Sequence, residues 1–154
     1  MQVNDKVADF TLQTEEDKTV HLKDLSGKPV VLFFYPRADT PGCTIEACGF
    51  RDVFKKIQQA GAVVLGISRD TPKAQKKFKE KYNLPYTLLS DVDEVVCKQF
   101  DVLKEKNMYG KKVMGIERTT FLIGPDQKLL KIFPKVKPEG HAEEVLAAVK
   151  AAHG

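Results

Sequence analysis

Several features common in secreted and membrane proteins are missing from this sequence of 154 residues. It has three cysteines, an odd number that does not suit a secreted disulfide framework and better fits a reducing compartment where thiols are used chemically. No apolar run approaches the roughly 20 residues that cross a bilayer. Residues 1–6 are polar, so no secretory signal is expected. We therefore expect a cytoplasmic protein that does not contact membranes.

Motifs for metals, phosphates and nucleic acids are also missing. His21, His141 and His153 are scattered without metal-ligand spacing, and no glycine-rich phosphate loop is present. The net charge of +4 comes from 25 basic and 21 acidic residues that are largely interleaved. The lysine-rich residues 73–81 are interpreted as the solvated face of a helix. We expect no metal, no cofactor and no nucleic-acid partner.

The composition that remains is that of an ordinary globular protein. Hydrophobic residues make up 42% of the chain and charged residues 30%, and a chain of this length can bury a substantial core. No internal repeat, low-complexity tract or linker interrupts it. A single domain covering residues 1–154 is predicted.

Buried strands and amphipathic helices alternate along most of the chain. The predicted strands cover residues 29–35, 63–68 and 87–89, and the predicted helices cover residues 43–59, 71–82, 94–100 and 140–152. This alternation predicts a mainly parallel sheet covered by helices on both faces. Near the end of the chain, residues 119–123 and 128–133 predict an antiparallel hairpin, which makes the sheet mixed.

The N-terminal segment predicts a smaller element. Residues 10–11 and 19–22 alternate apolar with polar and flank a turn-like acidic cluster, which indicates a small hairpin or edge structure that covers the core as a lid. The order of the elements is that of a thioredoxin-like fold. The predicted fold class is therefore α/β, with a mixed central sheet flanked by helices and an N-terminal hairpin extension.

The most informative residue is Cys43, which follows an apolar strand and begins a predicted helix. Thr40 is predicted as the N-cap, Pro41 as the first helical residue and Gly42 as a residue that leaves the approach open. The sulfur then lies where free backbone N–H groups favour an anion. A helix N-terminus and a nearby cation lower the pKa of a thiol from about 8.5 to roughly 3.5–7.5. We expect a thiolate, the alternative being a small buried apolar residue.

The spacing of Pro36, Thr40 and Cys43 is Pro-x-x-x-Thr-x-x-Cys, which resembles the peroxidatic motif of the peroxiredoxins. Further blocks at residues 39–52, 64–68, 87–91 and 115–123 resemble, in order, the bacterioferritin comigratory protein (PrxQ) branch, and they span most of the chain. The resemblance implies a thiol peroxidase for hydrogen peroxide and organic hydroperoxides. It also implies thioredoxin, or else glutaredoxin, as the reductant, and a monomer.

Cleavage of a peroxide O–O bond by a thiolate needs an ionised sulfur, a donor for each oxygen and a fixed cation. Cys43 supplies the nucleophile in this interpretation. The hydroxyl of Thr40, which also acts as a helix cap, and the N–H groups of Gly42 and Cys43 supply the donors. Pro36 fixes the loop and shields the pocket from water.

Arg118 is the predicted cation. It precedes an apolar strand, where a charged residue needs a partner, and the resemblance implies that it lies against the catalytic thiolate. The alternative is an exposed residue at the mouth of a strand. Arg37 and Arg51 are near Cys43 in sequence but are less suited to touch it. Glu46, one helical turn after Cys43, either positions a proton or interacts with the helix dipole, and the second role is favoured.

Cys48 is the predicted resolving thiol. Five residues along an ideal helix it stands about 8.6 Å from Cys43 between α-carbons, beyond the roughly 7 Å limit for a disulfide, so the helix must unwind if the two pair. The alternative is that Cys48 only packs on the helix. Other members of the branch that it resembles resolve with a cysteine on a later helix, but residues 71–82 contain none. Cys97 is a weaker candidate, because its apolar neighbours favour packing.

Two other functions fit part of the pattern. A disulfide oxidoreductase on the same fold calls for Cys-x-x-Cys, whereas four residues separate Cys43 and Cys48. A non-enzymatic redox sensor or holdase is the second alternative, in which oxidation unwinds the helix and exposes Phe50 and Phe54. The predicted function remains a thioredoxin-dependent peroxiredoxin of the atypical two-cysteine type.

Overall fold

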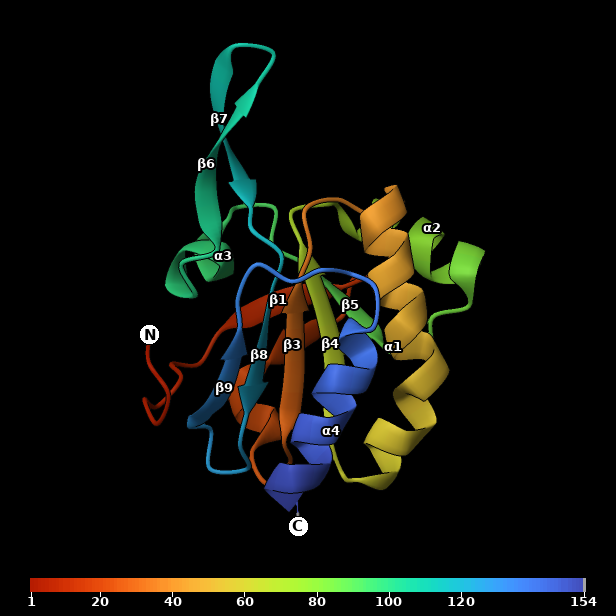
Figure 1. The fold of residues 1–154 in the computed structure, drawn as a ribbon, viewed down its shortest axis with the longest axis vertical. Helices are drawn as coiled ribbons and strands as arrows, with labels where there is room; N and C mark the ends of the chain where they lie inside the picture. Colours follow the sequence, from red (N-terminus) through yellow and green to blue (C-terminus); the bar gives the residue numbers. More distant parts are fainter. Residues whose placement is uncertain (154) are drawn as a thin grey trace.

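The structure is a computed structural model that describes residues 1–153. Its elements are, in chain order, β1 (Thr11–Thr14), β2 (Thr19–His21), the 3-10 helix η1 (Leu22–Leu25), β3 (Val30–Phe34), α1 (Pro41–Gln59), β4 (Val63–Ser68), α2 (Pro72–Tyr82), β5 (Thr87–Ser90), α3 (Val95–Gln99), β6 (Leu103–Met108), β7 (Lys111–Ile116), β8 (Thr119–Ile123), β9 (Leu129–Phe133) and α4 (His141–His153). Figure 1 shows a central sheet with helices packed around it.

The central sheet has the order β2-β1-β5-β4-β3-β8-β9. Only its middle is parallel, through the pairs β3–β4 and β4–β5. The pairs β3–β8 and β8–β9 are antiparallel, as the predicted C-terminal hairpin requires. The pair β1–β5 is antiparallel as well, so the sheet is mixed at both edges rather than mainly parallel. The predicted mixed sheet and thioredoxin-like fold class are confirmed.

The strand β3 separates two hydrophobic cores because successive side chains of a strand point to opposite faces. Val31, Phe33 and Tyr35 pack with residues of α1, α2 and α4. Leu32 and Phe34 pack on the other face, with residues of α3 and of the N-terminal segment. All five side chains are fully buried. This central strand therefore leads directly out of the core into the loop before α1.

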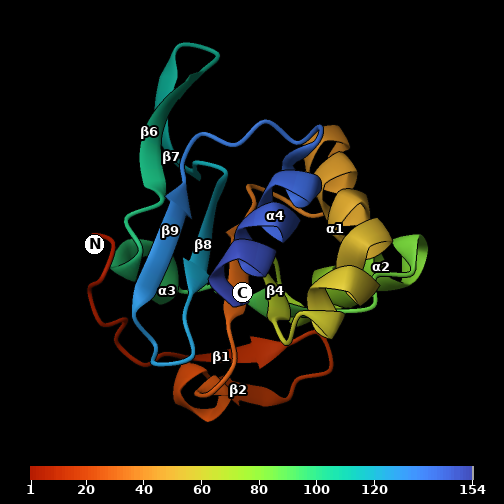
Figure 2. The ribbon, with the colours of Figure 1, turned by 60° about the horizontal axis from the view of Figure 1, so that its bottom comes forward.

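The N-terminal hairpin is present and lies at the edge of the sheet. The strand β1 pairs with β2 and also with β5, so the hairpin extends the edge of the sheet, as Figure 2 shows from below. Leu12 and Leu22 contribute their side chains to the core on that side. The predicted edge structure is confirmed, and the segment covers this core with the side chains of Phe10, Leu12 and Leu22 while β1 extends the sheet.

A second hairpin, formed by β6 and β7, was not predicted from the sequence. It is a separate two-stranded sheet that rises above the body of the molecule. Its strands are rich in lysine and show little apolar alternation, and Tyr109 and Gly110 form its turn with positive φ angles of 52° and 78°. The signal that could have revealed it is that turn rather than the pattern of burial. None of the described helices is long and apolar enough to cross a membrane.

Candidate active site

Cys43 lies in the first turn of α1, as predicted. The helix begins at Pro41, with Thr40 in the extended N-cap conformation, and the backbone N–H of Thr44 donates to the carbonyl of Thr40 over 2.9 Å. The N–H groups of Gly42 and Cys43 come before that bond, among the unpaired donors of a helix N-terminus. The side chain of Cys43 is 1% exposed and lies at the edge of the core formed with Phe33 and Tyr35.

Arg118 reaches this sulfur because of the register between β3 and β8. Phe34, the last residue of β3, pairs with Thr119, the first residue of β8, so Arg118 stands beside the loop that leads to Cys43. Its Nη2 donates to Sγ of Cys43 over 3.4 Å. The side chain of Arg118 is 15% exposed, which excludes the alternative of an exposed residue at the strand mouth.

Gly42 makes room for the guanidinium. A Cβ atom at this position would lie 3.0 Å from Nη2 of Arg118 and 3.5 Å from Cγ of Pro138. Contacts as short as 3.0 Å force a neighbouring group to shift. Gly42 was predicted to leave space beside Cys43. In the structure this space is filled by the guanidinium of Arg118, which lies close to the backbone at Gly42.

Glu46 is the second partner of Arg118. Nη1 of Arg118 donates to Oε1 of Glu46 over 2.8 Å, and the side chain of Glu46 is fully buried. Burial raises the pKa of Glu46 to about 7, although Arg118 lowers it. Burial also lowers the pKa of Arg118, but Glu46 and Cys43 raise it above its usual value, so the guanidinium stays charged. The sequence favoured a simple interaction of Glu46 with the helix dipole and did not predict this buried ion pair with Arg118.

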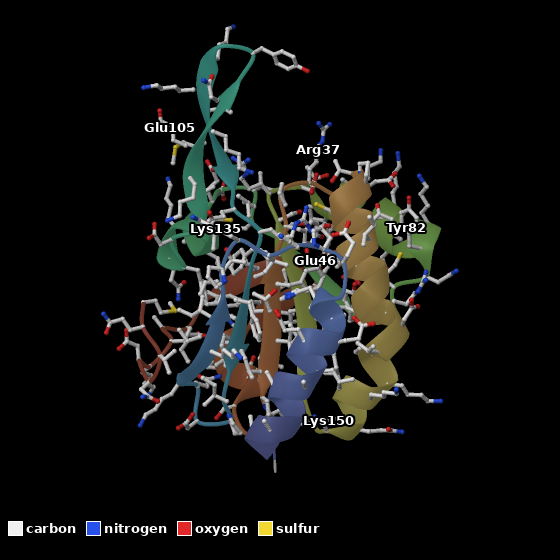
Figure 3. The ribbon with its side chains drawn as sticks, in the orientation of Figure 1. Arg37, Glu46, Tyr82, Glu105, Lys135 and Lys150 are labelled. Carbon is white, nitrogen blue, oxygen red and sulfur yellow. The ribbon has the colours of Figure 1, made fainter. Side chains whose placement is uncertain are left out.

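Thr40 differs from the prediction in one respect. Its hydroxyl donates to the carbonyl of Arg37 over 2.8 Å, and no side-chain capping bond to α1 is found in the described structure. The hydroxyl therefore fixes the loop by bonding backwards along the chain. Arg37 itself is exposed and points away from the body of the molecule in Figure 3, as expected for a residue outside the site.

Two carboxylates hold the loop before α1. The N–H of Ala38 donates to Oδ2 of Asp70 over 2.7 Å. On the other side, Asp39 accepts from Nζ of Lys81 at 2.9 Å and from the hydroxyl of Tyr82 at 2.7 Å. These hydrogen bonds lower the pKa of Asp39. The loop is thus anchored to the start and to the end of α2.

The other cysteines lie apart from this cluster, and all three cysteines of the chain are free thiols. Cys48 is half-buried on the intact helix α1. Arg51 binds Asp52 and the carbonyl of Tyr82 instead of approaching Cys43. Cys97 is fully buried, and burial raises the pKa of its thiol, as expected for a packing residue.

The structure therefore unites Cys43, Gly42, Thr40 and Arg118 around the start of α1, with half-buried Pro36 in the preceding loop. Sequence reasoning gave Glu46 too little weight and did not place His141, whose Nε2 lies 4.0 Å from Oε2 of Glu46. A histidine at the start of a distant helix carries no spacing signal that points to this contact. Within residues 1–153, no group of three or more His, Cys, Asp or Glu side chains could hold a metal ion.

This fold and this cysteine–arginine pair define a class, the thiol peroxidases built on a thioredoxin-like fold. Comparison with known proteins agrees, since residues 3–132 match the AhpC/TSA family. The chain is similar to the putative peroxiredoxin Bcp of Coxiella burnetii, with 56% identity over 95% of this chain and 97% of that protein. It is 44% identical to the peroxiredoxin Bcp of Bacillus subtilis, over 97% of this chain and 96% of that protein.

Solved structures give the same answer. The structure of the Xanthomonas campestris bacterioferritin comigratory protein, studied for its alkyl peroxide reduction activity, is 43% identical and superposes with a TM-score of 0.90, covering 94% of this chain and 92% of that one. BcpB from Mycobacterium tuberculosis is 42% identical, with a TM-score of 0.87, and the match covers 98% of this chain and 97% of that one. The chain belongs to the AhpC/TSA family, in its Bcp (PrxQ) branch, and it is a peroxiredoxin.

Proposed function

We propose that Cys43 is the peroxidatic cysteine of this peroxiredoxin. The observation that carries the proposal is the 3.4 Å contact between Nη2 of Arg118 and the sulfur of Cys43, at a helix N-terminus. Both the guanidinium and the free N–H groups stabilise a negative sulfur. The thiolate attacks one oxygen of a hydroperoxide, the O–O bond breaks, and the products are a sulfenic acid on Cys43 and an alkoxide or hydroxide that takes up a proton.

The charge that moves onto the leaving oxygen needs fixed donors. Arg118 is held by Glu46, so its fork of N–H groups is oriented before the substrate arrives. The N–H groups of Gly42 and Cys43 are placed to bind the peroxide oxygens. The hydroxyl of Thr40 donates its proton to the carbonyl of Arg37, so its oxygen serves as an acceptor for the O–H of the hydroperoxide. Pro36 shields this pocket from water. Hydrogen peroxide and organic hydroperoxides share the O–O group that these residues bind, so both are proposed as substrates.

We further propose that Cys48 resolves the sulfenic acid. The thiol of Cys48 attacks the sulfur of the oxidised Cys43, a disulfide forms and water leaves. Both residues lie on the continuous helix α1, so its first turns must unwind for the sulfurs to meet. Cys48 is half-buried and free, whereas Cys97 is sealed in the opposite core, which favours Cys48 as the partner.

An external dithiol then returns both cysteines to thiols and is itself oxidised to a disulfide. By similarity to the branch, we propose thioredoxin for this step, with glutaredoxin as the second candidate. We also propose that the chain works as a monomer in the cytoplasm. These assignments define an atypical two-cysteine, thioredoxin-dependent enzyme.

The test is peroxide consumption with thioredoxin, thioredoxin reductase and NADPH, combined with mass spectrometry of the linked cysteines. Cys43→Ser is expected to abolish turnover. Cys48→Ser is expected to reduce one equivalent of peroxide and then stall as a sulfenic acid. Cys97→Ser is the matched control and should turn over as the parent does, because Cys97 is fully buried in the core on the other face of the sheet from Cys43.

Two results would contradict the proposal. Full turnover by the Cys43→Ser variant would show that another residue reacts with peroxide. Full turnover by Cys48→Ser, with a disulfide between Cys43 and Cys97 or to the reductant itself, would remove Cys48 from the cycle while leaving Cys43 in place.

A further inference from the structure

The side chain of His141 is buried behind Glu46 and is held on several sides. It is the first residue of α4, is 3% exposed, and its Nε2 lies 2.7 Å from Oγ1 of Thr120. Its Nδ1 lies 3.2 Å from Oε1 of Glu144. The ring meets the edges or faces of Phe50 and Phe133 at centroid distances of 5.7 and 5.4 Å. These contacts fix the orientation of the imidazole.

One of the two carboxyl oxygens of Glu46 has no hydrogen-bond partner among the described residues. Oε1 accepts from Arg118, but Oε2 is buried and has no hydrogen-bond partner among residues 1–153. The polar atom that faces it is Nε2 of His141, at 4.0 Å. The approach depends on Gly49 of α1, where a Cβ atom would lie 3.3 Å from Cβ of Ala142 on α4. The close packing of the two helices therefore brings His141 up to Glu46.

The tautomer of His141 follows from its partners. Burial lowers the pKa of His141, so the ring is neutral near pH 7 and carries one proton. An ionised Glu144 can only accept, which places that proton on Nδ1. Nε2 then accepts from the hydroxyl of Thr120, and the negative end of the imidazole dipole faces Oε2 of Glu46. This orientation favours the protonated, neutral form of the Glu46 carboxyl.

The charge state of Glu46 matters because Arg118 has two partners. When Glu46 is ionised, its negative charge offsets the positive charge of the Arg118 guanidinium, and the thiolate of Cys43 is stabilised less. When Glu46 is neutral, the guanidinium is left to stabilise the thiolate, which lies 3.4 Å from Nη2. Because Glu46 titrates near pH 7, a small influence on its proton decides which case applies.

We propose that His141 is a positioning residue for peroxide reduction, and that it acts through Glu46 to determine how much of the charge of Arg118 reaches the sulfur of Cys43. The inference rests on the proposed function of Cys43. Tyr86, whose phenol lies within reach of the charge of Glu46, and Lys131, whose Nζ lies over the Phe133 ring, also face this cluster. They are the same in every variant below, so they do not account for a difference between variants.

The test is a double-mutant cycle between His141→Gln and Glu46→Gln. The amide that His141→Gln introduces can donate to Oε2 of Glu46 and thereby favours the ionised carboxylate. We expect His141→Gln alone to slow alkylation of Cys43 by iodoacetamide about tenfold at pH 6, which corresponds to a rise of about one pH unit in the midpoint of the alkylation profile. In the Glu46→Gln background, where this side chain is always neutral, the same substitution should change the rate less than about twofold.

Carbon-13 NMR of the Glu46 carboxyl gives a second readout, and we expect its titration midpoint to move to lower pH in His141→Gln. His21→Gln, at a half-buried histidine paired with Thr11 on β2, is the matched control and should leave both profiles unchanged. If His141→Gln slowed alkylation equally in the parent and in the Glu46→Gln background, His141 would have only a structural role and the inference would be overturned. An alkylation profile that does not change in His141→Gln would overturn it as well. Failure of the proposed function would show separately, as peroxide turnover in the Cys43→Ser variant.

Discussion

Replacement of the buried Glu46 by glutamine should remove a pH dependence of stability. Burial raises the pKa of this carboxyl from 4.5 to about 7 in the folded chain, so the folded state binds more protons than the unfolded state between these values. The stability that this proton supplies is fully present below pH 4.5 and is lost as the pH rises through about 7.

The structure sets the size of the effect. The interval from 4.5 to about 7, at about 1.4 kcal/mol for each pH unit, corresponds to about 3 kcal/mol. Glutamine has the shape of the protonated carboxyl and cannot ionise. Between pH 4.5 and pH 8, the parent chain should therefore lose about 3 kcal/mol of unfolding free energy relative to Glu46→Gln. His141, whose lowered pKa acts in the opposite direction, is present in both chains.

The assay is urea unfolding under reducing conditions at several pH values, followed by circular dichroism. Glu143→Gln, an exposed neighbour of the same residue type on α4, should show no such window. The reasoning would be refuted if the difference in unfolding free energy between the parent and Glu46→Gln stayed constant from pH 4.5 to pH 8. It would also be refuted if the parent gained stability relative to the variant at high pH, because the pKa of Glu46 would then not be raised in the folded chain.

Three further outcomes follow from the same contacts. Arg118→Met should slow the first oxidation of Cys43 roughly 100-fold or more in rapid-quench experiments, and an unchanged rate would remove Arg118 from the site. Gly42→Ala should slow it at least several-fold without a comparable loss of thermal stability, because the added methyl group displaces Nη2 of Arg118; an unchanged rate would mean that the guanidinium adapts. Tyr35→Phe should cost about 1–3 kcal/mol in urea unfolding, since the Tyr35 hydroxyl donates to buried Oε1 of Gln75 over 2.5 Å, whereas Tyr109→Phe at a fully exposed ring should cost nothing measurable.

The parts of the fold that the sequence predicts are those with strong periodicity. The buried run of β4 was predicted at residues 63–68, its observed bounds, and α1 was predicted within two residues of its start, because its apolar positions follow the helical repeat. The hairpin of β6 and β7 was missed because the first four residues of β7 are all exposed, so no alternation marks this strand.

The candidate site divides in the same way. Cys43 and its helix entry were visible because they form a local motif. Arg118 was found because a charged residue before a buried strand needs a partner, and because the family resemblance implied that this arginine lies against the thiolate. His141 was not found, since its contact with Glu46 depends on how α4 packs against α1, and that packing is set by small residues such as Gly49. Long-range packing leaves no spacing rule in the chain.

The single uninterrupted helix that carries both Cys43 and Cys48 has a kinetic consequence in the proposed cycle. After the first oxidation, the sulfenic acid waits for the helix to fray, and during that wait a second peroxide molecule can convert it to a sulfinic acid. The rate at which these first turns unfold therefore decides how much of the sulfenic acid is oxidised further before the disulfide forms. A substitution that stabilised these turns would make the reduced enzyme harder to unfold locally. At high peroxide concentration, the same substitution would speed the loss of active enzyme to the sulfinic acid form.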